Sequence, residues 1–441
     1  MKINKNRLLI LADDLTGALD TGVQFAKKNI DVLVHLSPLA AICNEDVPVQ
    51  VINTDSRHVS PEEASARIKT VADSFKDFTH FYKKTDSCLR GNIGAELQAL
   101  MDITGVQCLP FVPAYPDLKR ITVNGFQYIE RKPIHESSMA KDPLNPITES
   151  FIPAIIGKQS AIPVRSVPVN SGFSGTGANI DANIGTNTDA NIGANTGADT
   201  GARGILVFDA QSKDDLKNIA QELHRQQLLK ISAGCAGFAE ALMEVLPLEK
   251  NDTAGKITIP RLPVLIISGS LHPVSINQVK AAINNNIPGI NIAGDEITSP
   301  SWPGEDKLAD SCIQKLREKG ICLLGTQAAF GTAKPGDKKN GDFTEISNKI
   351  PDILGRKVRK IIDDAGPLHL VIFGGDTLLG ITKALGYNCI KPLKEIRSGI
   401  VLAKTQTQKD EGFLITKAGA FGEENLIQII LDFLNKDYIN D

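Results

Sequence analysis

The richest group of chemically active side chains lies in residues 82–94, YKKTDSCLRGNIG. Lys84 and Arg90 supply positive charge there, and Asp86 supplies a carboxylate that can accept a proton. The apolar lead-in and the following AELQALM predict a strand end, a polar turn and a helix start. Because a helix N-terminus presents free N–H groups, it suits an anion. The stretch predicts a site for a small carboxylate with a hydroxyl beside it. A solvated loop that caps a helix is the alternative.

Other polar groups follow neighbouring apolar runs in the same way. Strands alternate with helices five times in the first 115 residues, which predicts an open α/β sheet. Ligands in such sheets sit beyond the carboxyl ends of the strands. We therefore expect the polar groups that follow the strands to converge on one site: Asp13-Asp14, residues 55–57, residues 84–90 and residues 117–124.

Simpler explanations remain for several of these residues. Asp13 and Asp14 either cap the first helix or act as a base or a ligand to hydroxyls or Mg²⁺. Cys88 lies where an arginine and a helix start would lower its pKa, yet no Cys-His-Asp arrangement accompanies it. A nucleophilic thiol is therefore the weaker alternative. His58, His272 and His369 lie near strand ends, where a lone histidine is more often structural.

The second half of the chain repeats a different pattern. Glycine-rich turns follow apolar runs at Ser268-Gly269-Ser270, at Phe373-Gly374-Gly375-Asp376-Thr377 and at residues 417–422. Glycine lets a backbone approach a phosphate closely, and a helix start supplies donors. One such turn is weak evidence for a ligand site, but three in one domain favour a nucleotide-phosphate site. No G-x-x-x-x-G-K-[ST] motif and no G-x-G-x-x-G in strand-turn-helix context occurs.

Composition narrows the class of protein. A length of 441 residues predicts two domains, and a net charge of −3 without a long basic run argues against nucleic acid as a partner. No apolar run is long enough to span a membrane. The seven cysteines are scattered without a C-x-x-C pair, which argues against a disulfide frame and a structural zinc site. We predict a cytoplasmic protein.

The domain boundary is placed in the polar stretch 246–260. The predicted domains are residues 1–245 and 262–441, both α/β with largely parallel sheets and an active-site cleft between them. Residues 171–203 consist mainly of Gly, Ala, Asn, Thr and Asp, so they cannot form a core and predict a flexible insertion. A calcium-binding repeat is the alternative, but its nonapeptide spacing is not kept.

The ordered motifs of this chain resemble those of the four-carbon acid sugar kinases, which phosphorylate tetronates such as threonate and erythronate with ATP. The resemblance covers nearly the whole chain outside 171–203. It implies an N-terminal sugar-acid-binding domain and a C-terminal nucleotide-binding domain. It rests on residues 12–18, 84–94, 113–116 with 120–125, 268–270, 374–377 and 419–422.

The leading hypothesis is phosphoryl transfer from ATP to a hydroxyl of threonate, erythronate or a 3-oxo-tetronate. Asp14 or Asp86 would accept the hydroxyl proton. Mg²⁺ would neutralise the phosphate charge, and the sequence does not identify its protein ligands. The substrate would be bound by Asp13, Arg57, Lys84, Arg90 and Asn92. ATP would be bound by Ser270, His272, Gly374, Gly375, Asp376, Thr377 and Gly419. A homodimer is expected. The alternatives are a nucleotide-dependent oxidoreductase and a non-catalytic sensor of sugar acids.

Overall fold

The computed structural model describes residues 6–38, 46–141, 146–169, 203–251, 257–270, 272–292, 305–326, 343–405, 412–419, 421–436 and 438–439. The chain forms two compact units, Met1–Gln24 with Pro48–Glu249 and Phe25–Val47 with Lys250–Asp441. The sequence analysis had placed 25–47 in the first domain. This segment belongs to the second unit because its strand β2 (Val32–His35) pairs with β17 (Cys389–Arg397).

The first unit is built on a parallel sheet in the order β3-β1-β4-β11-β5-β10-β9. Its strands are β1 (Leu8–Ala12), β3 (Val49–Asn53), β4 (His80–Lys84), β5 (Cys108–Val112), β9 (Val164–Val167), β10 (Gly204–Phe208) and β11 (Ile231–Gly234). Strands β1 and β3 are buried along their whole length. Such strands must be covered on both faces, and apolar runs are typical of them.

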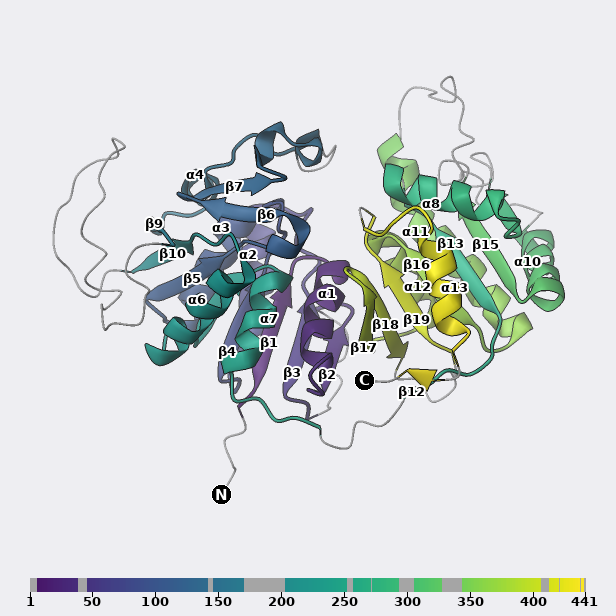
Figure 1. Ribbon diagram of the computed structural model, residues 1–441, viewed down its shortest axis with the longest axis horizontal. Coiled ribbons are helices and arrows are strands. Elements are labelled where there is room, and N and C mark those ends of the chain that lie inside the picture. Colours follow the sequence, from purple (N-terminus) through teal and green to yellow (C-terminus); the bar gives the residue numbers. More distant parts are fainter. Residues whose placement is uncertain are drawn as a thin grey trace. The chain divides into compact units, whose positions relative to one another are not determined.

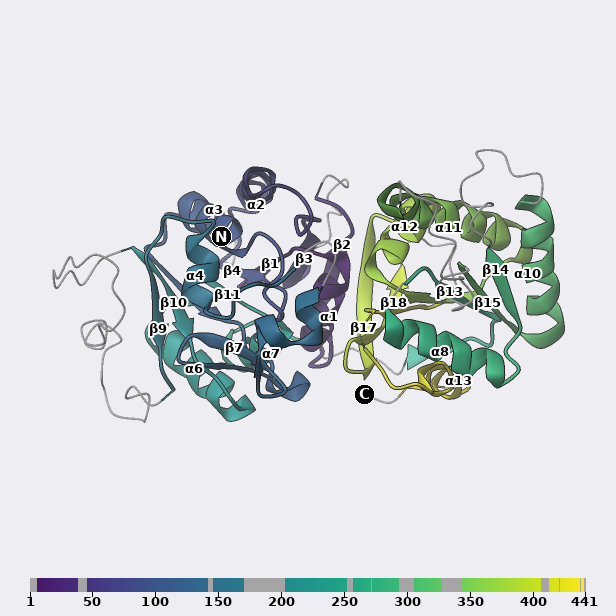
Figure 2. The same ribbon diagram turned by 90° about the horizontal axis from the view of Figure 1, so that it is seen from above.

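Helices provide that cover (Figures 1 and 2). Helices α2, α3 and α4 pack on one face of the sheet, and α6 with α7 pack on the other. The helices of this unit are α1 (Leu15–Ala26), α2 (Pro61–Ser74), α3 (Ile93–Thr104), α4 (Ile152–Gly157), α6 (Lys213–Arg225) and α7 (Ala236–Val245). The Ser60 hydroxyl accepts from the Glu63 N–H at 3.2 Å, so the predicted start of α2 is confirmed.

An antiparallel three-stranded sheet, which the sequence analysis missed, follows β5. It contains β6 (Arg120–Val123), β7 (Phe126–Ile129) and β8 (Lys132–Pro133). The β6–β7 turn is Asn124-Gly125, and both residues have positive φ, 51° and 75°. The Asp209 carboxylate accepts from both N–H groups. An Asn-Gly pair is a strong hairpin signal, so the sequence did contain it. Asn124 therefore serves the turn, not the predicted site.

The second unit has the strand order β14-β15-β13-β16-β19-β18-β17-β2. Neighbouring strands are parallel from β14 through β15, β13 and β16 to β19. Strands β18, β17 and β2 each pair antiparallel with the strand before them in this order. The remaining strands are β13 (Val264–Ser268), β14 (Gly289–Ile292), β15 (Ile321–Thr326), β16 (His369–Phe373), β18 (Ile400–Thr405) and β19 (Leu414–Lys417). Two short strands, β12 (Ile257–Thr258) and β20 (Tyr438–Ile439), pair with each other.

Helices cover both faces of this sheet too. Helices α8 and α13 lie on one face and α10, α11 and α12 on the other (Figure 2). Their bounds are α8 (Pro273–Asn284), α10 (Glu305–Lys319), α11 (Phe343–Ala365), α12 (Gly375–Leu385) and α13 (Leu426–Leu434). A Cβ on Gly355 of α11 would lie 2.5 Å from the Gly380 carbonyl oxygen of α12, so these helices touch through their glycines.

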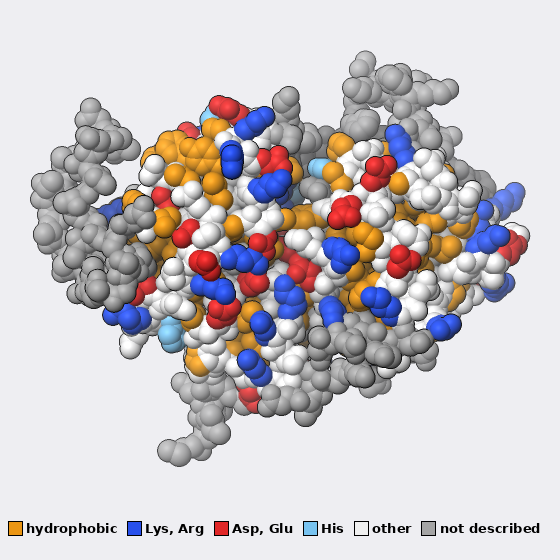
Figure 3. Space-filling model, viewed as in Figure 1, with side chains coloured by type: hydrophobic (Ala, Val, Ile, Leu, Met, Phe, Trp, Pro, Cys, Tyr) orange, Lys and Arg blue, Asp and Glu red, His pale blue; other side chains and the backbone are white. Residues whose placement is uncertain are grey.

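The predicted class, two α/β parts with largely parallel sheets, is confirmed. The predicted flexible insertion 171–203 lies outside the described residues except for Arg203, which pairs with Asp102. Cys389 is disulfide-bonded, which differs from the expected absence of disulfides. Within the described ranges, no helix is both long and apolar enough to cross a membrane. On the face drawn in Figure 3, acidic and basic side chains are interspersed.

Candidate active site

The parallel register of the first unit brings three of the predicted polar groups to one edge. Ala12, the last residue of β1, pairs with Asn53 at the end of β3 and with Lys84 at the end of β4. The chain passes from β1 to β3 on one side and then to β4 on the other, so β1 and β4 flank a topological switch point. Ligands of open α/β sheets bind at such points.

Arg57 joins the two aspartates that follow β1. Its Nε donates to Asp13 Oδ2 at 2.7 Å, while Nη1 and Nη2 lie 2.9 Å from the two oxygens of Asp14. Burial alone would raise the pKa of Asp14, but Arg57 and Lys84 lower it below its ordinary value. Asp14 is therefore an ionised carboxylate at neutral pH, able to accept a proton.

Lys84 lies beside Asp14 at the start of helix α1. Its Nζ donates to the Thr85 carbonyl at 2.8 Å, and the residue is buried. A Cβ on Gly17 would lie 2.5 Å from Asp14 Oδ1 and 2.9 Å from Lys84 Nζ. A side chain at this position would displace both groups, which is consistent with glycine in the sequence motif.

Asp86 and Arg90 form a second charged pair on the loop after β4. Arg90 Nε donates to Asp86 Oδ2 at 2.6 Å, and Nη2 donates to Oδ1 at 3.2 Å. Burial would raise the pKa of Asp86, but Arg90, Arg57 and Arg120 together lower it far below its usual range. The carboxylate is thus held ionised by a fork of two hydrogen bonds.

Two other residues of the 82–94 stretch have structural partners. Asn92 donates its side-chain N–H groups to the carbonyls of Ser56 and Val59, at 2.9 and 2.8 Å. The Gly94 N–H donates to the Gln159 side chain at 2.8 Å. At Gly94, a Cβ would lie 2.5 Å from the Ile156 carbonyl oxygen. Gly94 therefore allows α3 to pack closely on α4, and its N–H at the helix start is occupied.

Cys88, whose role the sequence left open, belongs to a small core. It is buried with Ile134 and Ile147. Burial raises the pKa of its thiol, and the Asp86 carboxylate raises it further. The nucleophilic thiol expected as the weaker alternative is therefore not supported, because a thiol with a raised pKa is a poor nucleophile.

The sequence analysis missed a buried ion pair behind the site. Lys83, next to Lys84 in β4, pairs with Glu96 of α3. The Ser56 hydroxyl donates to the other oxygen of Glu96. Ser56 precedes Arg57, so this network ties β4, α3 and the loop after β3 together. Alternating side-chain direction in a strand could have shown that Lys83 and Lys84 point to opposite faces.

The three glycine turns of the second unit also meet at one edge. Ser268 of β13 pairs with Phe373 of β16, and Phe373 pairs with Lys417 of β19. A Cβ on Gly419 would lie 3.2 Å from Ser270 Oγ, and one on Gly374 would lie 3.5 Å from Ser270 Cβ. We call Ser270, Gly374 and Gly419 the glycine cradle. Because glycine has no side chain, the backbone of this cradle can approach a phosphate closely.

The other predicted nucleotide residues surround this cradle. Thr377 is buried against Gly269, and Gly375 is the first residue of α12. Asp376 is exposed in the first turn of α12. His272 caps α8, and its Nδ1 accepts from the Val274 N–H at 3.2 Å. This hydrogen bond leaves the proton of the neutral imidazole on Nε2.

Lys417 contacts the glycine cradle and was not among the predicted nucleotide ligands. Its Nζ donates to Ser275 Oγ at 2.7 Å and to the Gly419 carbonyl at 2.9 Å, and it lies 4.8 Å from the centre of the Phe373 ring. Burial lowers the pKa of Lys417 to about 7. The feature of the sequence that could have identified Lys417 is its place as the first residue of the glycine-rich turn 417–422.

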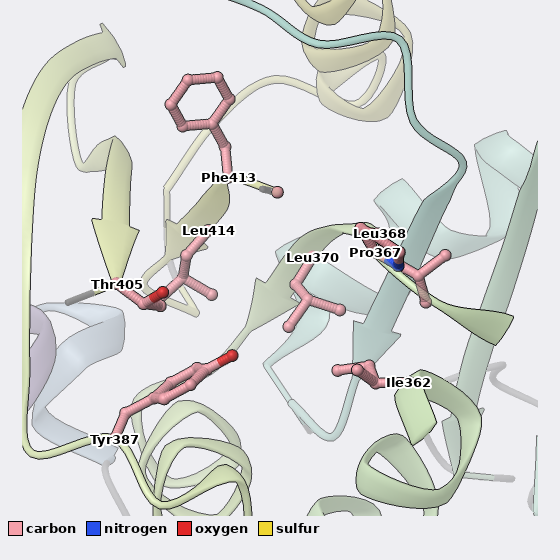
Figure 4. Close-up of a pocket in the computed structure, with 9 residues that line it drawn as sticks. Ile362, Pro367, Leu368, Leu370, Tyr387, Thr405, Phe413 and Leu414 are labelled. Atoms are coloured by element: carbon pink, nitrogen blue, oxygen red, sulfur yellow. The ribbon is translucent and has the colours of Figure 1, made fainter. Parts of the chain in front are cut away.

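The pocket drawn in Figure 4 is unrelated to the cradle. Its lining includes Leu370 of β16, Leu414 of β19 and Tyr387. Leu370 and Leu414 lie near the amino ends of their strands, whereas the cradle follows the carboxyl ends. In the described part of the chain, no group of three or more His, Cys, Asp or Glu residues could hold a metal ion.

Comparisons with known proteins agree with this layout. Residues 8–242 match a family model described as a sugar-binding N-terminal domain, and residues 265–427 match one described as a nucleotide-binding C-terminal domain. The chain is 28% identical to the D-threonate kinase of Salmonella typhimurium, covering 99% of this chain and 100% of that protein. It is 27% identical to the D-erythronate kinase of Heliobacterium modesticaldum, covering 97% of each.

Further similarities extend over the whole length. The 3-oxo-tetronate kinase of Methylobacterium radiotolerans is 24% identical, with 96% of this chain and 98% of that protein covered. A solved structure of a Haemophilus influenzae protein has the same fold, with a TM-score of 0.71, 20% identity and coverage of 97% and 100%. The resemblance seen in the sequence motifs is thereby confirmed, and the chain belongs to the four-carbon acid sugar kinase family.

Proposed function

We propose that the protein is an ATP-dependent kinase that phosphorylates a hydroxyl group of a four-carbon sugar acid. The observation that carries this proposal is the meeting of Asp14, Arg57 and Lys84 at the switch point of the first sheet. These groups suit an anion that also carries hydroxyl groups. The glycine cradle of the second unit suits the phosphates of a nucleotide.

In the proposed reaction, Asp14 accepts the proton of the attacking hydroxyl. The hydroxyl oxygen bonds to the γ-phosphorus of ATP, the bond to the bridging oxygen breaks, and ADP leaves. Asp14 is the better base because its side chain is 24% exposed, against 11% for Asp86. Asp86 remains a second catalytic candidate, and it fixes Arg90. Asp13, Arg57, Lys84, Arg90 and Asn92 form the proposed substrate site, with Asn92 acting through the backbone that it holds.

The proposed nucleotide site consists of the glycine cradle together with His272, Gly375, Asp376 and Thr377. The cradle fits a phosphate because a Cβ on Gly419 would fill it, 3.1 Å from His272 Cβ. We propose that Mg²⁺ arrives bound to the ATP phosphates and supplies charge neutralisation there. In kinase sites Mg²⁺ is usually bound through the substrate phosphates and one or two carboxylates, and a dedicated protein cage is not needed.

Two other functions were considered from the sequence. A nucleotide-dependent oxidoreductase is disfavoured because the turn after β1 lacks the dinucleotide fingerprint. A non-catalytic sensor would need only the first site, whereas this chain also has the glycine cradle. The relatives named above are kinases, so neither alternative is favoured.

The decisive experiment is ADP release measured over a panel of D- and L-threonate, D- and L-erythronate and 3-oxo-tetronates. Turnover with one of them is expected, and it would identify the acid and its stereochemistry. ATP binding without turnover of any small sugar acid would refute the proposed substrate class. Binding of a sugar acid without ATP consumption would support the sensor, and binding of NAD would support the oxidoreductase.

We further propose that residues 1–245, apart from the segment 25–47, act as the sugar-acid domain, and that residues 262–441 together with that segment act as the nucleotide domain. The family models, which end at residue 242 and start at residue 265, support this division. A cytoplasmic location and a homodimer are also proposed. Light scattering of the purified protein tests the dimer: a mass of about 47.4 kDa would refute it, and twice that mass is expected.

A further inference from the structure

We propose that Arg120, at the start of β6, binds the carboxylate of the sugar acid. This inference rests on the proposed function, and it names the residue that recognises the acid group. In the prediction from the sequence, Lys84 and Arg90 supplied the positive charge for the carboxylate, and Arg57 was a further substrate-binding residue.

Two of the three arginines are already committed to carboxylates of the protein. Arg57 uses Nε, Nη1 and Nη2 on Asp13 and Asp14. Arg90 uses Nε and Nη2 on Asp86. A substrate carboxylate would have to compete with these partners, because a forked arginine–carboxylate pair uses both donors of one side of the guanidinium.

Arg120 has no such partner in the described part of the chain. Its Nη1 donates to the neutral hydroxyl of Ser87, and no described carboxylate forms an ion pair with it. Among the described residues, its buried Nε meets no hydrogen-bond partner. Burying a charged donor without a partner is costly, so the arrangement is expected to be completed by an anionic ligand.

Two arginines elsewhere in the described part of the chain differ in this respect. Arg203 pairs with Asp102, and the guanidinium of Arg7 lies 4.1 Å from the centre of the Phe78 ring. Arg203 therefore has a counterion, and the cation of Arg7 is attracted by the face of an aromatic ring. Arg120 differs from both because no described carboxylate forms an ion pair with its guanidinium.

The position of Arg120 is fixed by its surroundings. Its backbone N–H and carbonyl bond to Tyr115, at 3.1 and 2.7 Å. Gln127, fully buried on the neighbouring strand β7, donates to the Ser87 carbonyl at 3.1 Å. The hairpin that carries Arg120 is thus tied to the loop that carries Asp86. A side chain held in this way needs little ordering when it binds a ligand.

The charge balance of the site points to a monoanion. Asp13, Asp14 and Asp86 supply three negative charges, and Lys84, Arg57, Arg90 and Arg120 supply four positive charges. One positive charge remains, which a single carboxylate neutralises.

Lys84 and Arg120 also both act on the buried thiol of Cys235. Burial raises the pKa of this thiol to about 11, and the two cations oppose the rise. Both cations therefore act electrostatically on the same thiol.

The test compares binding of the acid with binding of the matching neutral polyol. Titration calorimetry without nucleotide should show that Arg120→Met raises the Kd of the preferred tetronate about 10- to 100-fold, as expected for a lost charged hydrogen bond. The Kd of erythritol or threitol, which lack the carboxylate, should not change. Arg120→Lys, which keeps the charge but loses the fork, should fall between the two, and added guanidinium should partly restore Arg120→Met.

Ser87→Ala is the control for a structural role, since it removes the hydroxyl partner and leaves the arginine. Its tetronate Kd should stay within about 3-fold of wild type. Unchanged tetronate binding in Arg120→Met, or an equal loss of tetronate and polyol, would overturn the inference. Absence of tetronate binding to wild type would overturn it as well. ADP release by wild type is a separate readout, so failure of the kinase proposal is distinguishable from failure of Arg120.

Discussion

Lys83 Nζ lies 3.1 Å from Glu96 Oε2, and the two side chains are only 0% and 1% exposed. This ion pair stands directly behind the candidate substrate site, between β4 and α3. Burial raises the pKa of Glu96 while Lys83 opposes that rise. Removing one partner leaves an uncompensated buried charge, which is more costly than the net worth of the pair.

Lys83→Met should therefore reduce the free energy of unfolding by about 3–5 kcal/mol. Denaturant unfolding followed by circular dichroism measures this change. Lys69→Met is the matched control, because the Lys69–Asp102 pair, at 3.4 Å, is partly exposed. Its cost should be below about 1 kcal/mol. Equal costs for the two variants would show that the buried pair has no special role.

Asp14→Asn should lower kcat by about 10²–10⁴, because an amide cannot accept the hydroxyl proton. Asp86→Asn should also lower kcat, since it breaks the fork to Arg90. Steady-state ADP release measures both, and thermal unfolding shows that the variants stay folded. Asp363→Asn, a change at an exposed residue paired with Arg359, is the control and should leave kcat unchanged. Wild-type rates in both Asp14→Asn and Asp86→Asn would refute these roles.

Gly419→Ala should raise the KM for ATP at least about 10-fold while leaving tetronate binding intact. The added methyl would stand 3.2 Å from Ser270 Oγ and occupy the space proposed for phosphate. A loss of one charged hydrogen bond corresponds to about this factor. Gly157→Ala is the control, because a Cβ there meets no atom within 4 Å. An unchanged KM for ATP in Gly419→Ala would place the nucleotide elsewhere.

Lys417 should make stability depend on pH above neutrality. Its pKa is about 7 in the folded protein, against an ordinary value of 10.5. Between these values the unfolded chain binds more protons, so the free energy of unfolding rises with pH, by at most about 1.4 kcal/mol per pH unit. Urea unfolding at several pH values between 7 and 10 measures the slope.

Lys417→Met should flatten that slope, whereas Lys383→Met, a change at an exposed lysine on α12, should keep it. A slope that is equal in wild type and Lys417→Met would show that Lys417 is charged throughout this range. Bound ATP is expected to raise the pKa of Lys417, because a phosphate nearby favours the charged amine.

The sequence by itself determined the class of fold and the strand ends at which the ligand sites are proposed. Apolar runs that end in Asp13-Asp14, Lys84 and Gly374 predict strand ends, and parallel strands must bring those ends to one edge. That inference needs only local pattern and elementary sheet geometry. The hairpin at Asn124-Gly125 was within reach of the same reasoning, although its signal was overlooked.

Only the tertiary structure decided which charges are free to bind a ligand. Arg57, Arg90 and Arg120 look equivalent in the sequence, yet the first two are neutralised by aspartates and the third meets a serine hydroxyl. Gly94 lies in the stretch predicted to bind an anion, but it packs against α4. Ion pairs and close packing depend on residues that the chain brings together over long distances. Residue type and spacing do not determine these contacts, which form only when the chain folds.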